Sequence, residues 1–121
     1  MIVCAIDDLI FSIKIKTAAK QLGVDVHFER SRETVLPTVR DKRPSLVIFD
    51  LNSSRLAPME TIAAMKADPE LKRVMTIGYV SHVDSDAIGA ARQAGCDQVL
   101  ARSTFAERLG PILSSSGSLL S

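Results

Sequence analysis

A chain of 121 residues is long enough for one domain, and its 46% content of hydrophobic residues is enough to form a core. With four Phe, one Tyr and no Trp, that core has to be built from Ile, Val, Leu and Ala. The net charge is +1, and neither a basic stripe nor a long charge run is present, which argues against nucleic acid as a partner. No apolar run approaches the ~20 residues of a membrane span, and the N-terminus lacks the positive segment of a signal peptide. We therefore expect a cytoplasmic protein without a membrane partner.

The first part of the chain has the pattern strand, helix, strand. Residues 1–6 form a continuous apolar run, which is typical of a strand buried on both faces of a parallel sheet. Apolar residues then recur at helical spacing from Phe11 to Leu22, and Gly23 is a typical helix stop. Residues 24–28 alternate between apolar and polar side chains, which predicts a short second strand.

The middle of the chain continues the alternation. A weaker helical pattern covers residues 33–42, where Pro37 either delays the start of the helix or bends it. The apolar run 45–49 predicts the third strand. Residues 52–58 contain two serines and a proline, which predict a loop, and residues 59–67 again show helical spacing.

The last part predicts a fourth strand over 74–80, a fourth helix over 85–95, a fifth strand over 98–101 and a helix over 104–113. Thr104 and Glu107 have the spacing of a capping box at the start of that last helix, and Gly110-Pro111 interrupts or ends it. We expect a domain formed by residues 1–112, followed by a flexible Ser-rich tail over 113–121.

Five alternations of strand and helix are typical of the α/β class, with a doubly wound parallel sheet and helices on both faces. Cys4 and Cys96 lie in or beside apolar segments without the spacing of metal ligands, so we expect buried, reduced thiols. His27 and His82 are far apart in the sequence and form no ligand motif.

Acidic and polar side chains follow the predicted strands. In open α/β sheets the ligand site lies at the carboxyl ends of the strands, so these residues are the candidates for chemistry. Close carboxylates repel one another unless a cation intervenes, and Mg²⁺ is a hard cation that prefers oxygen ligands. The residues that follow strands one, three, four and five are Asp7 and Asp8, Asp50 and Asn52, Ser81 and His82, and Arg102 and Ser103.

The order and spacing of these segments resemble the receiver domain of two-component response regulators, over residues 1 to about 110. The stretches "MKADPELKRVMTIGYVSH" and "QAGCDQVLAR" carry the resemblance together with Asp50. It implies a single (βα)₅ domain of flavodoxin/receiver type with the strand order 2-1-3-4-5. It also implies that Asp50 is the phosphoacceptor and that Mg²⁺ is held by Asp7, Asp8, Asp50 and the backbone carbonyl of Asn52. Whether Asp7 alone or Asp7 with Asp8 forms the acid pocket stays open.

The function that follows from the resemblance is signal transduction by a stand-alone response-regulator receiver in a phosphorelay, not catalysis by an enzyme. Its partner would be a histidine kinase or another signalling protein, and the chain itself a monomer or a weak homodimer.

Several positions depart from the receiver pattern. Arg102 and Ser103 stand where the family has Lys and Pro, and Val99 stands where it has an aromatic residue. Val80 stands where the family has Thr or Ser, with Ser81 one residue later. Ser81 and Arg102 are therefore the candidates to lie near a phosphoryl group. These departures favour an alternative function, a pseudo-receiver that binds proteins without being phosphorylated.

The acids also have structural interpretations. Asp7 or Asp8 can serve only as the N-cap of the first helix. Asp50 can be paired with Arg102, and we expect a metal-free structure to direct Arg102 towards Asp50, directly or through water. A phosphatase of the haloacid-dehalogenase type is disfavoured, because it needs a second acid where this chain has Asn52, and a flavodoxin-like cofactor site is disfavoured by the lack of a Gly-rich phosphate loop.

Overall fold

Among the described residues, five short strands form one parallel sheet in the order β2-β1-β3-β4-β5, as predicted. The structure is a computed structural model that describes residues 1–81 and 84–115. The strands are β1 (Ile2–Ala5), β2 (Val26–Glu29), β3 (Leu46–Asp50), β4 (Met75–Val80) and β5 (Gln98–Ala101). The three central strands are mostly buried, because helices cover both faces, and this explains why they appear in the sequence as apolar runs rather than alternating patterns.

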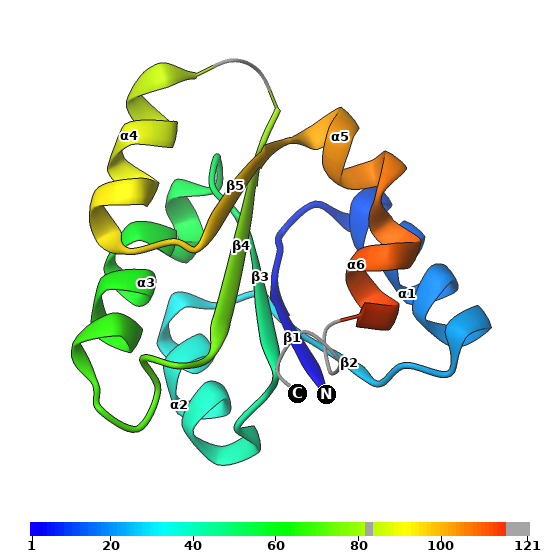
Figure 1. The fold of residues 1–121 in the computed structure, drawn as a ribbon, viewed down its shortest axis with the longest axis horizontal. Coiled ribbons are helices and arrows are strands. Elements are labelled where there is room, and N and C mark those ends of the chain that lie inside the picture. Colours follow the sequence, from blue (N-terminus) through cyan, green and yellow to red (C-terminus); the bar gives the residue numbers. More distant parts are fainter. Residues whose placement is uncertain (82–83, 116–121) are drawn as a thin grey trace.

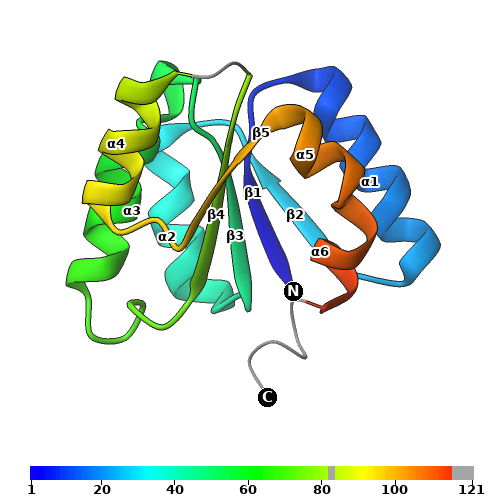
Figure 2. The same cartoon turned by 45° about the horizontal axis from the view of Figure 1, so that its top comes forward.

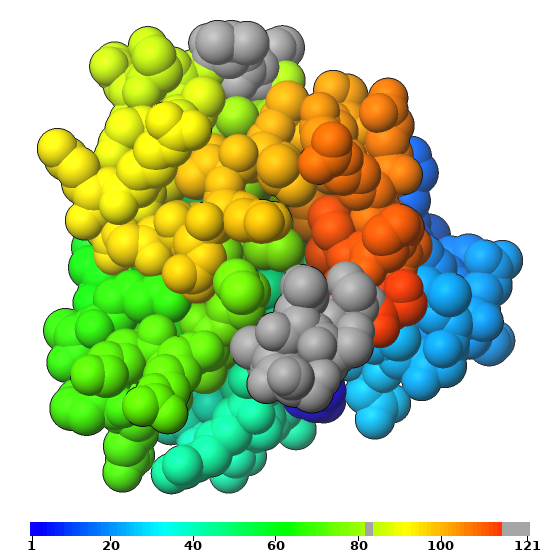
Figure 3. All heavy atoms as spheres, viewed as in Figure 1, coloured from blue at the N-terminus to red at the C-terminus, as the bar shows by residue number. Residues whose placement is uncertain are grey.

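In the part of the chain that the structure describes, six α-helices flank the sheet in two groups (Figures 1 and 2). Helices α1, α5 and α6 lie on one face and helices α2, α3 and α4 on the other. Figure 3 shows the orange-to-red α5–α6 segment in direct contact with the blue α1 helix. The helices are α1 (Leu9–Leu22), α2 (Arg32–Lys42), α3 (Pro58–Ala67), α4 (Ser85–Ala94), α5 (Arg102–Glu107) and α6 (Leu109–Ser115).

Each face of the sheet has its own core. On the α1 side, Phe11 and Ile15 pack with Tyr79 and Phe105. On the other side, helices α2 to α4 cover an aliphatic cluster around Phe49. Both cysteines are buried and free, and burial raises the pKa of the Cys4 thiol to about 12, so this thiol stays protonated.

Local sequence signals explain several helix ends. Gly23 and Gly95 close α1 and α4 in the left-handed conformation, with φ of 69° and 101°. Pro37 lies inside α2, which begins at Arg32, so the proline does not delay the helix start. The loop expected over 52–58 contains a short 3₁₀ helix, η1 (Ser54–Leu56), and ends where α3 begins at Pro58.

The C-terminal helices differ from the expectation. The predicted capping box is wrong, because α5 begins at Arg102 directly after β5, and Thr104 lies inside the first turn. The helical segment is interrupted at Arg108, since Pro111 lacks an N–H and its ring would collide with the carbonyl of residue 107. Helix α6 continues to Ser115 with Leu113 buried, so it extends three residues past the predicted domain boundary. Residues 116–121 of the predicted tail lie outside the described residues.

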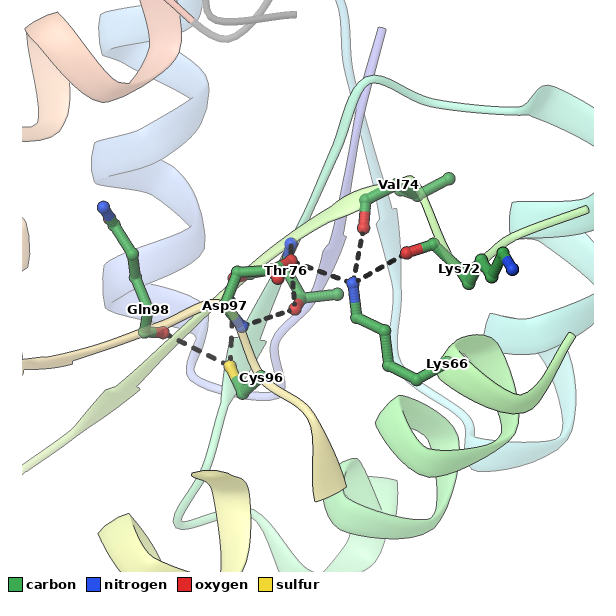
Figure 4. Close-up of polar contacts among 7 residues, drawn as sticks. All are labelled: Lys66, Lys72, Val74, Thr76, Cys96, Asp97 and Gln98. Atoms are coloured by element: carbon green, nitrogen blue, oxygen red, sulfur yellow. Dashed lines mark hydrogen bonds and ion pairs between the residues drawn. The ribbon is translucent and has the colours of Figure 1, made fainter. Parts of the chain in front are cut away.

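A polar cluster fixes the sheet edge opposite to the candidate site (Figure 4). Lys66 Nζ on α3 donates hydrogen bonds to the carbonyls of Lys72 and Val74 and to Asp97 Oδ2 at 2.9 Å. The same carboxylate oxygen accepts from the backbone N–H and the hydroxyl of Thr76 on β4. These bonds tie α3, β4 and the segment before β5 together at the strand ends remote from the candidate site.

Candidate functional site

The residues expected at one site do converge at the carboxyl edge of the sheet. Ala5 pairs with Phe49, and Asp50 pairs with Tyr79. Val80 in turn pairs with Ala101. Strands β1, β3, β4 and β5 therefore end at the same edge, and the residues that follow them are the acids, Asn52, Ser81 and Arg102 of the sequence prediction. His82 lies outside the described residues.

Asp8 has both a structural and an electrostatic role. Its Oδ1 accepts a hydrogen bond of 3.1 Å from the backbone N–H of Phe11, which caps the N-terminus of α1. Its Oδ2 accepts from Nη2 of Arg102, which makes an ion pair between the first loop and the start of α5. The N-cap interpretation is thus confirmed for Asp8, and its carboxylate is at the same time occupied by a cation.

Arg102 points into the site, but its partner differs from the one we predicted. The expected pairing with Asp50 is not the observed one, since the ion pair is with Asp8. The guanidinium also lies over the ring of Phe11, 4.7 Å from its centroid, and this contact keeps the side chain on the α1 side. Its charge nevertheless acts on Asp50: burial raises the pKa of that carboxyl, and the positive charge of Arg102 offsets part of the rise.

Asp7 is paired with an arginine that the sequence interpretation did not single out. Arg55 Nη1 lies 3.4 Å from both carboxylate oxygens of Asp7. Arg55 belongs to η1, which follows β3, so this pair joins the loops after β1 and β3. No local motif marks Arg55, because its position depends on contacts with α2 that lie far away in the sequence.

Asp50 is the half-buried acid at the end of β3. Its Oδ1 accepts a hydrogen bond of 3.0 Å from the backbone N–H of Asn52. Burial raises the pKa of Asp50, and the negative charges of Asp8 and Asp7 raise it further, against the opposing effects of the Asn52 hydrogen bond and Arg102. The charges of Asp7 and Asp8 therefore act on Asp50, as expected for acids at the same edge of the sheet.

The chain beyond Asp50 is held by close packing. The N–H of Leu51 donates to the carbonyl of Tyr79 at 3.0 Å, and the Leu51 side chain lies over Gly78. A Cβ at Gly78 would lie 2.6 Å from Leu51 side-chain carbons, so only glycine leaves room for this arrangement. Strand β4 thus helps to orient the residues that follow the candidate nucleophile.

Ser81 and Asn52 are bonded to each other. The backbone N–H and the hydroxyl of Ser81 both donate to Asn52 Oδ1, at 2.6 and 2.9 Å. Val80 is 1% exposed and belongs to the core on the α2–α4 side. Ser81 therefore supplies an exposed hydroxyl at this edge and links β4 to the loop after β3.

An open cavity of about 670 Å³ lies beside Arg102, between α1 and α5. Its apolar walls include Ile10, Phe11 and Ala106, and Lys14 and Arg102 supply positive charge. Beneath it, the ring of Tyr79 stacks on Phe105 with centroids 5.1 Å apart and lies 4.8 Å from Phe11. The Tyr79 hydroxyl is buried and has no hydrogen-bond partner among residues 1–81 and 84–115.

The donor chemistry fits a divalent cation, although the conformation does not present a formed metal cluster. Asp7, Asp8 and Asp50 supply carboxylate oxygens, which Mg²⁺ prefers. Two of these carboxylates are paired with arginines. Within the described part of the chain, no three His, Cys, Asp or Glu side chains are gathered in a way that could hold a metal ion. A metal would therefore have to replace an arginine as the partner of at least one acid.

Comparisons with known proteins find structural neighbours and no sequence relatives. No family model matches the chain, and no curated protein sequence matches it. A response regulator from Hahella chejuensis superposes with a TM-score of 0.87 over 99% of this chain and 96% of its own, at 16% identity. The receiver domain of a sensor histidine kinase from Pseudomonas aeruginosa, with magnesium in its active-site cleft, gives 0.82 over 96% of both chains at 19% identity. The phosphorylated cyanobacterial phytochrome response regulator RcpA gives 0.78 at 21% identity, covering 98% of this chain and 91% of its own.

This chain has the receiver fold. The resemblance stated from the sequence is confirmed at the level of the fold, including the strand order. In the part of the receiver-like chain that the structure describes, no helix combines the length and hydrophobicity that a membrane crossing requires.

Proposed function

We propose that the protein is a receiver domain that transduces a signal through phosphorylation of Asp50. The observation that carries the proposal is the placement of Asp50 at the carboxyl end of β3, half-buried and within electrostatic reach of Asp7, Asp8 and Arg102. A carboxylate in such a position is a suitable nucleophile towards phosphorus, provided that cations balance the charge of the phosphoryl oxygens.

The reaction would transfer a phosphoryl group from a phosphohistidine of a kinase. A carboxylate oxygen of Asp50 attacks phosphorus, the P–N bond breaks, and its electron pair stays on the imidazole nitrogen, which leaves an acyl phosphate on Asp50. Arg102 is the cation from the β5–α5 junction that would face the phosphoryl oxygens, and the Ser81 hydroxyl would donate a hydrogen bond once released from Asn52.

Asp7, Asp8, Asp50 and the backbone carbonyl of Asn52 would hold Mg²⁺ in this proposal. The ion would supply positive charge for the transferred oxygens. The metal- and phosphate-bearing neighbours support this assignment only through their common fold.

A protein partner is supported by the surface of α1 next to the site. Leu9, Ile10 and Ile13 are 56%, 79% and 57% exposed, which is unusual for large apolar side chains on one helix. These residues follow directly on the acids of the β1–α1 loop. A histidine kinase or another signalling protein that contacts them would bring its reactive group close to Asp50.

A specific observation favours a second function, a pseudo-receiver that binds proteins without phosphorylation. Arginines already neutralise Asp7 and Asp8, and a buried valine stands at the hydroxyl position of β4. In this second function the ion pairs of the pocket only hold the loops together, and the α1 surface alone contacts the partner protein.

Intact-mass measurement after incubation with Mg²⁺ and acetyl phosphate separates the two functions. The receiver proposal predicts one added phosphoryl group in the wild type and none in Asp50→Asn. Replacing Arg102 by Lys and Val80 by Thr should increase the labelled fraction, because a hydroxyl would then stand at the end of β4 and a more compact cation beside it. Absence of labelling in both the wild type and this double variant would favour the pseudo-receiver.

A further inference from the structure

We propose that Arg55 is a built-in counter-cation of Asp7 that competes with a divalent metal and so sets the metal affinity of the pocket. This inference rests on the proposed metal site and concerns its regulation. Arg55 is a loop arginine after the third strand, at a position that the receiver pattern does not mark.

The backbone of the Arg55 segment is anchored independently of its side chain. Arg32, the first residue of α2, donates from Nε to the carbonyl of Arg55 and from Nη2 to the carbonyl of Ser54, both at 2.8 Å. These bonds hold η1 against the N-terminus of α2. The loop therefore stays in place whatever partner the Arg55 guanidinium has.

The guanidinium itself spans to the neighbouring loop. It lies 3.4 Å from both oxygens of Asp7, in a geometry in which one cation faces the whole carboxylate. The Arg55 side chain is 72% exposed and that of Asp7 31%, so this pair lies at the rim of the pocket and can open without disturbing the core. Water and salt weaken the pair, which makes it displaceable.

The Asp7 carboxylate cannot bind the Arg55 guanidinium and a divalent metal at full strength at the same time. A divalent metal that took Asp7 as a ligand would bring two positive charges close to the guanidinium, and the arginine would have to move away. Any free energy that the Asp7–Arg55 pair contributes is therefore subtracted from metal binding. Conversely, metal binding releases Arg55 at the mouth of the site, where η1 and the start of α2 form a shallow polar pocket lined by Ser31, Arg32, Glu33 and Arg55.

The Arg102–Asp8 pair is harder to displace than the Asp7–Arg55 pair. Arg102 is held by the Phe11 ring and is only 37% exposed, and Asp8 remains bound to the α1 backbone as its cap. In the described structure Arg55 has no aromatic contact, and its partner Asp7 does not cap a helix. Arg55 is therefore the first arginine that a metal would displace.

The experiment is a titration of the full chain with Mn²⁺ alone, in which the electron paramagnetic resonance signal counts the free ion. Arg55→Gln removes the charge and leaves the Arg32 bonds to the backbone intact. We expect it to bind Mn²⁺ about two- to fivefold more tightly than the wild type, the effect of losing one exposed ion pair. Arg55→Lys keeps the charge and should stay close to the wild type.

Arg43→Gln is the matched control. Arg43 forms an exposed ion pair with Glu70, also at 3.4 Å, with side chains 66% and 70% exposed. This variant loses the same charge and a similar pair, but away from the pocket, so it measures the effect of net charge. Tighter binding in Arg55→Gln than in Arg43→Gln supports the proposal, and raising the salt concentration should narrow the difference.

Two other outcomes overturn it in distinguishable ways. If the wild type binds Mn²⁺ and Arg55→Gln binds it with the same affinity, Arg55 does not compete and only this inference fails. If neither protein binds Mn²⁺ at millimolar concentration, the metal site of the proposed function fails and the inference fails with it.

Discussion

Tyr79→Phe should stabilise the protein, although it changes a residue beneath the candidate site. Tyr79 is 2% exposed, and its hydroxyl has no hydrogen-bond partner among the described residues. Burial also raises the pKa of Tyr79, so the hydroxyl is neutral over the whole working pH range. Burial of the hydroxyl therefore costs desolvation free energy that no hydrogen bond in the described structure offsets.

The magnitude follows from two opposing effects. An unsatisfied buried hydroxyl costs about 1–3 kcal/mol, and removal of its oxygen leaves a small void that takes back part of this gain. The ring contacts with Phe105 and Phe11 are unchanged by the substitution. We expect the free energy of unfolding to rise by about 1 kcal/mol, which corresponds to a rise in Tm of about 4 °C for a domain of this size.

Urea denaturation followed by far-ultraviolet circular dichroism measures this change. Tyr79→Leu is the control, because it removes the hydroxyl together with the ring, and the loss of the aromatic contacts should make it less stable than the wild type. If Tyr79→Phe loses more than about 1 kcal/mol instead, the hydroxyl has a partner, such as an ordered water or the Asp50 carboxylate, and our description of the aromatic cluster is wrong.

Three further predictions concern the charged residues. Asp50→Asn should stabilise the metal-free protein at neutral pH, because burial raises the pKa of Asp50. This gain in stability should shrink as the pH falls through the raised pKa and vanish below the usual carboxyl pKa of 3.8. Urea denaturation at a series of pH values, in the presence of a chelator, measures it. Asp97→Asn should destabilise the protein: burial alone would raise the pKa of Asp97, but the bonds from Lys66 and Thr76 outweigh burial and lower this pKa. The variant should therefore lose about 1 kcal/mol of unfolding free energy at neutral pH, and the difference should disappear in acid as the wild-type carboxylate is protonated. Arg102→Ala should destabilise the metal-free protein by about 1 kcal/mol, through its ion pair with Asp8 and its contact with Phe11, and less in saturating Mg²⁺; an equal loss in thermal melts with and without the ion would contradict a shared pocket.

The fold could be predicted because its signals are local and agree with one another. Parallel strands covered on both faces have to be apolar along their whole length, and this makes the run before Asp50 recognisable. Gly23 and Gly95 mark helix ends for a backbone reason that holds in any context. Asp50 could be placed at the sheet edge because the apolar run of β3 ends at this acid.

The pairing of charges could not be predicted, because it depends on tertiary contacts. Arg102 could have paired with any of three carboxylates at this edge. Its contact with the ring of Phe11 places it beside Asp8. Arg55 reaches Asp7 from a loop whose backbone is bound by Arg32, 23 residues earlier in the chain. The capping-box spacing at Thr104 failed since the end of β5 starts the helix earlier than the local motif suggests.

The most direct test of the account is to locate the phosphoryl group. Protein treated with Mg²⁺ and acetyl phosphate is reduced with borohydride, which converts an aspartyl phosphate to homoserine, and the peptides are then identified by mass spectrometry. We predict homoserine at position 50 and an unchanged aspartate at positions 7 and 8. Homoserine at one of those two positions, or at none in a sample that also shows no added mass, would contradict the assignment of Asp50 as the phosphoacceptor.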